Sequence, residues 1–402
     1  MSVFYVDPIH GSDEHNGSAP ELAVKNYRVL NVQAGDSVLF RRGSLIRDYL
    51  DTVAGRADTP TVYGAWGEGE RPVFIVSADI SSPELWTEEG GGIWSCDYGF
   101  SGDIGNLIFN GSECSATLRW EKSGLSGIGD FYDEAFGCGA HRPKGAKLYL
   151  FSGDNPGKVF SSIEAAQYGK YCNTRGNGYT VYEDLEFVNS GVHAFQGSCV
   201  GVTMRRCAFR RIGGCVWSKE LRIRFGNCVE FWDLGDDILI EDCVFENVYD
   251  SCVTHQGGAD VKTAQNFVCR RNRFDTYGMA AFEYRDRLPV NSSFTENICE
   301  NAGCGFAMLG ETLPRRSEIW PQPMGHHIFL WRIDAPDGDS GVLISGNRFG
   351  AAPVGSAVYS IISSEAEERI VFSENEYTGE PKASVFYGGK HFENGEEWEK
   401  NK

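Results

Sequence analysis

The sequence has no long hydrophobic run and no excess of basic residues. No stretch of about 18 apolar residues occurs in the 402-residue chain, so no segment is expected to span a membrane. Asp and Glu outnumber Lys and Arg by 56 to 37, which gives a formal net charge of −19. Nucleic acids and anionic membranes bind basic surfaces, so neither is expected as a partner. The same charge weighs against a polyanionic carbohydrate and favours a neutral or small ligand.

The sequence also has no recognisable export signal and no CxxC pair. It opens with Met1-Ser-Val-Phe-Tyr-Val-Asp-Pro8, in which no basic segment precedes an apolar one. Thirteen cysteines, an odd number, then favour buried reduced thiols and a cytoplasmic location. The acidic turn at Asp233, Asp236 and Asp237 is interpreted as solvated rather than as a calcium site. We therefore predict no metal and no cofactor.

Amphipathic helical runs are absent, and from residue 176 onward a repeating β unit is present instead. Each unit has a β-rich run followed by a Cys or Asn, in most cases with an aromatic residue two positions later. The Cys or Asn recurs at Cys207, Cys243, Asn272, Asn297, Asn347 and Asn375. Irregular spacing is expected where loops of different length leave a corner of a coil. Stacked Asn, Cys and aromatic residues are typical of parallel strands in register, about 4.8 Å apart.

These patterns predict an all-β protein, a right-handed parallel β-helix (solenoid) with an inserted β-sandwich-like domain. The handedness follows the usual rule for parallel crossovers. Residues 1–83 are expected to form an N-terminal cap and the first coils, and residues 84–172, with strands at hairpin spacing, the inserted domain. Residues 173–390 would form the main β-helix with its catalytic face, and the charged tail 391–402 a loosely held end. The oligomeric state is left open.

Three N-terminal segments resemble a known group of proteins. They are Tyr5-Val-Asp-Pro with Gly11-Ser-Asp, then Ala34-Gly-Asp-Ser-Val-Leu-Phe-Arg-Arg-Gly43, and Tyr63-Gly-Ala-Trp-Gly-Glu-Gly-Glu-Arg-Pro. They are similar to β-helix repeat proteins grouped with pectate-lyase-like enzymes, and closer to bacterial β-helical glycoside hydrolases of the β-xylosidase and fucosidase/xylanase kind. The resemblance covers most of the chain and implies a carbohydrate-active protein that uses side chains on one face of its coils. No motif fixes the sugar.

Acidic residues recur in one column of the segment from Arg224 to Arg287. Thr254 and Glu283 lie nine positions after the aromatic anchors of their units, and a shared Cys-Val pattern places Glu230 level with Thr254. Glu230 and Glu283 would then be two coils apart, roughly 9–10 Å between backbones.

The expected separation bears on the reaction. Inverting glycosidases hold two carboxyl groups about 6.5–9.5 Å apart. Asp250, one coil from both, would give a spacing nearer the roughly 5–5.5 Å of a retaining enzyme. Glu230, Asp250 and Glu283 are the predicted catalytic residues, with inversion slightly favoured. The alternative is that Glu230 and Glu283 form structural ion pairs with nearby arginines, namely Arg222, Arg224, Arg285 or Arg287.

Residues around this column are expected to bind substrate. Aromatic faces stack on sugar rings, and amide, imidazole and guanidinium groups bond to hydroxyls. The long insertion at 310–327 would roof the same cleft. The candidates are Asn227, Trp232, His255, Gln256, Tyr284, Arg285, Trp320, His326 and His327.

The sequence therefore favours a glycoside hydrolase acting on imported, mostly neutral oligosaccharides through a carboxylate acid/base pair. One alternative is a polysaccharide lyase or epimerase, in which Arg285 or Arg287 would hold a uronate carboxylate. Another is a non-catalytic glycan-binding β-helix.

Overall fold

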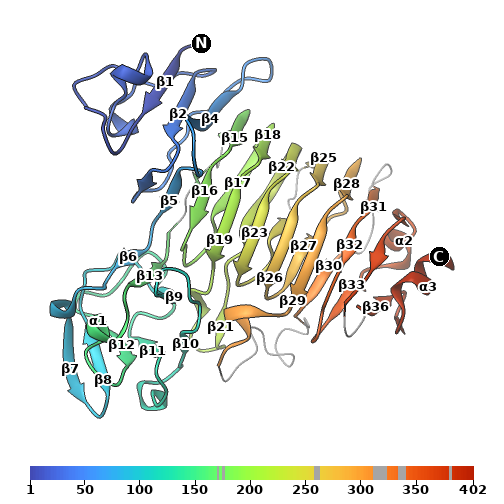
Figure 1. Cartoon of the computed structure of the whole chain (residues 1–402). Coiled ribbons are helices and arrows are strands. Elements are labelled where there is room, and N and C mark those ends of the chain that lie inside the picture. Colours follow the sequence, from blue (N-terminus) through green and yellow to red (C-terminus); the bar gives the residue numbers. More distant parts are fainter. Residues whose placement is uncertain (170–171, 174–176, 258–262, 311–323, 334–340, 380–382) are drawn as a thin grey trace.

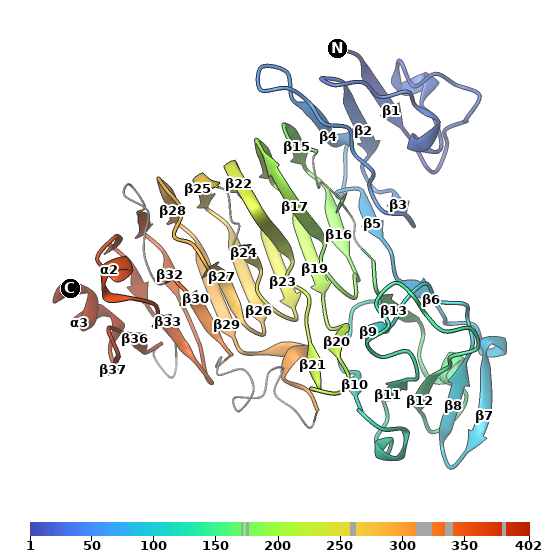
Figure 2. The ribbon, with the colours of Figure 1, turned by 180° about the vertical axis from the view of Figure 1, so that it is seen from behind.

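The computed structural model shows a long stack of coils with a separate β unit beside its first turns (Figure 1). The structure describes the chain except for residues 170–171, 174–176, 258–262, 311–323, 334–340 and 380–382. Parallel pairing links successive coils, so the main body is a parallel β-helix, as predicted. It has three walls, and Figure 2 shows the stack from behind.

The first wall carries the predicted acidic column. Its strands are β14 (Cys172–Asn173), β17 (Phe195–Val200), the start of β22 (Val229–Glu241), β24 (Val253–Gln256), β27 (Ala280–Arg285), β30 (His326–Trp331), β33 (Ser356–Ile361) and β36 (Val385–Tyr387).

The second wall is continuous with the N-terminal coils, because β4 pairs with β15. Its strands are β1 (Val3–Val6), β2 (Ser37–Arg41), β4 (Thr61–Trp66), β15 (Thr180–Glu183), β18 (Val202–Arg205), the end of β22, β25 (Thr263–Arg270), β28 (Ser292–Thr295), β31 (Val342–Ser345) and β34 (Ile370–Ser373). β22 belongs to both walls and turns between them at Asp233, which has a φ of 68°.

The third wall closes the coil. Its strands are β3 (Leu45–Ile46), β5 (Val73–Ile75), β16 (Glu186–Val188), β19 (Ala208–Ile212), β23 (Val244–Val248), β26 (Arg273–Tyr277), β29 (Ile298–Ala302), β32 (Arg348–Phe349) and β35 (Glu376–Tyr377). Its inward residues form the predicted aromatic stack: the rings of Phe209, Phe245 and Phe274 follow one another at centroid distances of 5.0 and 4.8 Å.

The predicted Cys and Asn positions form a ladder. The backbone N–H of Cys243 donates to Asn272 Oδ1 at 2.9 Å, and that of Asn272 donates to Asn297 Oδ1 at 2.9 Å. The same bond recurs through Asn347 to Asn375. Each side chain therefore satisfies a buried backbone group of the neighbouring coil, which explains why a small polar residue recurs at this corner.

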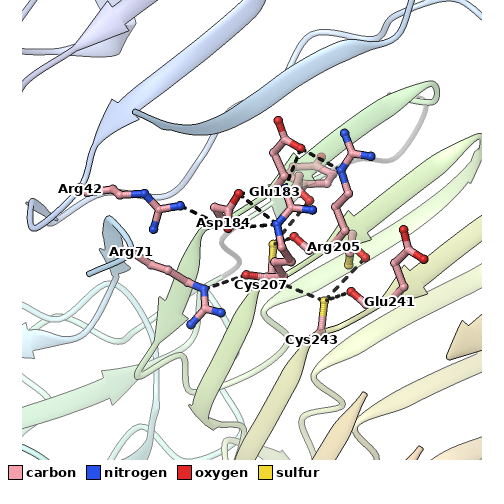
Figure 3. A network of polar contacts seen from close by, with 11 residues as sticks. Arg42, Arg71, Glu183, Asp184, Arg205, Cys207, Glu241 and Cys243 are labelled. Carbon is pink, nitrogen blue, oxygen red and sulfur yellow. Dashed lines mark hydrogen bonds and ion pairs between the residues drawn. The ribbon is translucent and has the colours of Figure 1, made fainter. Parts of the chain in front are cut away.

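Charged residues cluster at the corner between the second and third walls (Figure 3). Their ion pairs join adjacent coils. In register across adjacent strands, Arg205 lies between Glu183 and Glu241, and its Nε donates to Glu183 Oε2 at 2.8 Å. One residue further on, Asp184 and Arg206 pair in the same way, each with a φ near 55°. Opposite charges on neighbouring coils favour this pairing over a slipped one.

The inserted unit consists of two mainly antiparallel sheets around a second core. One sheet contains β6 (Ala78–Asp79), β9 (Ile104–Phe109) and β13 (Ile163–Gln167), and the other contains β7 (Trp86–Gly90), β8 (Ile93–Cys96), β10 (Thr117–Leu118), β11 (Asp130–Asp133) and β12 (Leu148–Phe151). A hairpin of β20 (Val216–Ser218) and β21 (Ile223–Arg224) leaves the β-helix, and Val216 joins the core of the inserted unit.

The remaining elements are short. They are η1 (Pro20–Leu22), η2 (Tyr27–Val29), η3 (Pro83–Leu85), η4 (Lys122–Gly124), η5 (Gly305–Met308), α1 (Pro156–Val159), α2 (Ser364–Glu367), α3 (Gly395–Lys400) and β37 (Lys390–Phe392). In the described part of the chain no helix is long and apolar enough to cross a membrane. The cysteines whose side chains are described are all free thiols.

The prediction of a loose charged tail is wrong. Trp398 of α3 is buried against Phe372 and Tyr387. Glu399 accepts hydrogen bonds from the backbone N–H and Nδ2 of Asn375, the last position of the ladder. An open β-helix end exposes apolar residues and unpaired amides, and the tail covers both.

Candidate functional site

A pocket of about 360 Å³ opens on the first wall, beside the β20–β21 hairpin. Its lining combines carboxylates, amides and aromatic rings. The lining residues are His193, Gln196, Trp217, Ile223, Phe225, Asn227, Glu230, Trp232, Asp250, Gln256, Glu283 and Arg285.

The predicted register of the acidic column is confirmed. Glu230 lies opposite Thr254, and Thr254 lies opposite Glu283 on the next strand. Glu230 and Glu283 are therefore two coils apart, and coil spacing places their backbones roughly 9–10 Å apart. Asp250 precedes the middle strand and lines the same pocket.

Glu230 is held by three neutral amides. Gln196 Nε2 donates to Oε1 at 2.7 Å, while Asn227 Nδ2 and Gln256 Nε2 donate to Oε2 at 2.8 and 2.6 Å. Burial alone raises the pKa of Glu230, but the charge of His193 and the bonds from Asn227 and Gln196 outweigh it, so the pKa lies below its usual value. Glu230 is thus an ionised, fixed carboxylate at neutral pH.

Glu283 has two different donors, one just before β24 and one on β30. Ser251 Oγ donates to Oε2 at 2.9 Å, and Trp331 Nε1 donates to Oε1 at 2.6 Å. The backbone N–H of Ser251 in turn donates to Asn227 Oδ1 at 3.1 Å. Asn227 and Ser251 therefore connect the two glutamates and fix their relative orientation.

Arg285 lies at the edge of the pocket. Its Nη1 donates to Gln256 Oε1 at 2.6 Å, and its Cζ lies 4.4 Å from the ring centroid of Trp331. Gln256 also donates to Glu230, so only one side chain separates Arg285 from Glu230 in this hydrogen-bond chain. Arg224, weighed as an ion-pair partner of the glutamates, instead donates to the backbone carbonyls of Gly214 and Gly105.

Comparison with known proteins bears on the fold. No family model and no curated protein matches this chain. The complex of XylC with xylose aligns with a TM-score of 0.54 and 15% identity over 94% of this chain and 63% of XylC. The GH136 lacto-N-biosidase from Eubacterium ramulus aligns at 0.49 and 14% over 94% and 61%, and pectate lyase Pel9A at 0.43 and 11% over 94% and 77%.

The chain has a parallel β-helix fold, and XylC is similar to it at the level of the fold. The resemblance inferred from the N-terminal motifs is confirmed at this level. The chain spans about three-fifths of the length of XylC and of the lacto-N-biosidase.

Four predicted substrate-binding residues do not reach the pocket of this β-helix. His255 and Tyr284 lie opposite each other in register, next to Thr254 and Glu283, and both point into the coil interior, fully buried. Strand side chains alternate between faces, so only every second residue of the column faces the pocket. His327 is also inside, stacked on Phe349.

His326, the fourth, lies outside the core but is covered. Its ring stacks on Tyr359 at a centroid distance of 4.6 Å, and its Nδ1 is 2.9 Å from Ser356 Oγ. Trp320 lies outside the described residues.

Within the described part of the chain, no three His, Cys, Asp or Glu side chains are grouped as metal ligands would be.

Sequence reasoning missed five lining residues. Gln196 lies opposite Glu230 one coil earlier, so extending the acidic column by one unit would have found it. His193 precedes the same strand and donates Nδ1–H to the carbonyl of Asn227. Trp217, Ile223 and Phe225 come from the β20–β21 hairpin or directly after it, and the repeat pattern gives no signal for them.

The hairpin is positioned by the inserted unit. The backbone N–H of Val216 donates to Asp103 Oδ2 at 2.8 Å, and Lys219 Nζ lies 3.1 Å from Tyr132 Oη. Trp217 keeps 56% of its surface exposed while lining the pocket. The inserted unit therefore supplies the support for one aromatic side of the site.

Proposed function

We propose that the protein is a glycoside hydrolase that acts on mostly neutral oligosaccharides. The observation that carries this proposal is a pocket in which two glutamates, two coils apart, lie among the aromatic side chains Trp217, Phe225 and Trp232. Aromatic faces bind sugar rings, and a carboxyl pair at this spacing suits acid/base cleavage of a glycosidic bond.

The surroundings of the glutamates suggest their roles. Glu230, ionised and held by amides, is the general base that activates water. Glu283 is then the general acid that protonates the leaving oxygen, and the roughly 9–10 Å backbone spacing favours inversion. The cytoplasmic location and the import of the substrate stay predictions from the sequence.

The charges in the pocket favour a neutral substrate. Among the lining residues that the structure describes, Arg285 is the only Lys or Arg. Its guanidinium is bonded to Gln256 and lies 3.3 Å from the carboxylate of Asp286. A uronate carboxylate would have to compete with both partners and with the nearby charge of Glu230.

The test is a panel of neutral aryl glycosides and oligosaccharides with the purified protein. Hydrolysis should fall by about 10²–10⁴-fold in Glu230→Gln and in Glu283→Gln. Glu246→Gln, which changes a glutamate paired with Arg210 on the third wall, should keep full activity. NMR analysis of the product anomers distinguishes inversion from retention. Retention would indicate that Asp250 and one of the two glutamates form the catalytic carboxyl pair. An unsaturated product from a uronate polymer, without hydrolysis of neutral glycosides, would instead show a lyase.

A further inference from the structure

A second pocket, of about 660 Å³, lies between the first coils and the inserted unit. Figures 1 and 2 show the chain running from β5 of the first coils into β6 of that unit. Its lining comes from five separate stretches of the chain. The residues are Arg47, Asp48, Tyr49, Asp51, Val76, Ser101, Ala140, Gln167, Tyr168 and Gly169.

The two pockets meet at a pair of aromatic rings. Phe225 lines the pocket that contains the glutamates, and Tyr168 lines the second one. Their ring centroids are 6.3 Å apart. The pKa of Tyr168 is raised mainly by burial, then by the charges of Cys215 and Asp103, and least by that of Glu230.

The second pocket has the groups that bind neutral sugars. Tyr49 is 44% exposed, and the guanidinium of Arg28, fixed by Asp48, lies 4.6 Å from its ring centroid. An aromatic ring supported in this way is a rigid platform. The side chain of Gln167 is oriented by bonds to Ser101 and to the carbonyl of Val76.

The charges of this pocket are largely compensated internally. Arg47 pairs with Glu164, and Arg28 pairs with both Asp48 and Asp51. A charged ligand would therefore have to displace existing ion pairs, whereas hydroxyl groups would not.

We propose that the second pocket binds the distal sugar residues of the same oligosaccharide, and that Tyr49 and Tyr168 select for chain length. This inference rests on the proposed function. It narrows the substrate to neutral oligosaccharides that are long enough to extend past Phe225 and Tyr168. Such a substrate has sugar units beyond the two that flank the cleaved bond.

Chain-length dependence tests the inference. The probes are xylo-oligosaccharides and lacto-series oligosaccharides of two to six residues, with the aryl monoglycoside that the panel identifies as the short reference. Lengthening the substrate should lower KM. Tyr49→Ala should raise KM for the longer substrates by about tenfold and leave kcat/KM for the monoglycoside unchanged. Tyr49→Phe should retain the gain because it keeps the ring.

Tyr98→Ala is the matched control, because Tyr98 is an equally exposed tyrosine of the inserted unit that lines neither pocket. A KM that does not depend on length, or a dependence that survives both Tyr49→Ala and Tyr168→Ala, would overturn the inference while leaving hydrolysis of the monoglycoside intact.

A binding measurement separates this inference from the proposed function. Calorimetric titration of Glu283→Gln with the six-residue probes should show affinity that drops about tenfold in the double variant with Tyr49→Ala. If no glycan is hydrolysed by the wild type but this drop is seen, the hydrolase proposal fails and the binding site stands. If no probe binds, the second pocket is not a glycan site.

Discussion

Trp331 donates its indole N–H to Glu283 Oε1 at 2.6 Å from the neighbouring coil. The indole also lies against the guanidinium of Arg285, which bonds to Gln256 beside Glu230. Trp331 thus bonds directly to Glu283 and is linked to Glu230 through Arg285 and Gln256. Its position depends on parallel register, since Trp331 lies opposite Arg285.

Trp331→Phe should lower kcat by about 10–100-fold, because the indole N–H stabilises the carboxylate that forms as Glu283 gives up its proton, and a hydrogen bond to a charged group is worth about 1.5–3 kcal/mol. The phenyl ring keeps the packing, so the unfolding midpoint in urea should change little. Trp66→Phe is the control: its indole N–H donates to the carbonyl of Val6, in the first coils. Equal activity losses in both variants would argue against a specific role for Trp331.

Gln196→Met should move the acidic limb of the kcat/KM profile to higher pH. The amide of Gln196 stabilises ionised Glu230, so its loss raises the pKa of that carboxylate and the base is protonated earlier as pH falls. The profile should be recorded between pH 3 and 9 with the best aryl glycoside. Asn266→Ala, which removes an exposed amide bonded to Asp237, should leave the limb in place.

Asn297→Ala should destabilise the β-helix by about 2–4 kcal/mol, because it leaves the backbone N–H of Asn272 and the carbonyl of Cys269 buried without their partner. Urea unfolding followed by circular dichroism measures this loss. Asn31→Ala, at an exposed position, should change stability by less than about 0.5 kcal/mol.

Trp398→Ala should cost about 3–5 kcal/mol, because it removes the largest apolar side chain of the C-terminal cover. Lys400→Ala, on the exposed side of the same helix, should be nearly neutral. Differential scanning calorimetry would measure both. If Trp398→Ala left the stability unchanged, the C-terminal tail would not contribute to closing the end of the β-helix.

Acid should destabilise the protein as pH falls from about 6.5 towards 4. Burial lowers the pKa of both His255 and His327 to about 4, so the unfolded chain binds more protons than the folded one in this range. The stability they contribute is present above pH 6.5 and is lost as pH falls through 4, on the order of 3 kcal/mol for each. His255→Leu should reduce the slope of unfolding free energy against pH between 4 and 6.5. An unchanged slope would mean that other groups cause the acid sensitivity.

The sequence alone determined the coil and its register. A small polar residue at one corner and a following aromatic recur because parallel coils stack like residues on like residues, which is a local and repetitive constraint. The column of Glu230, Thr254 and Glu283 follows from that register, and the structure shows it.

Tertiary structure decided which residues reach the pocket. His255 and Tyr284 belong to the correct strands but lie on the inward face, because each directly follows a residue of the column and side chains alternate between the two faces of a strand. Trp217 enters the pocket because the inserted unit, more than 40 residues earlier in sequence, holds the hairpin through Asp103. Contacts between adjacent coils repeat along the chain and therefore leave a pattern in the sequence. Contacts between an insertion and a coil do not repeat, so they depend on the complete tertiary structure.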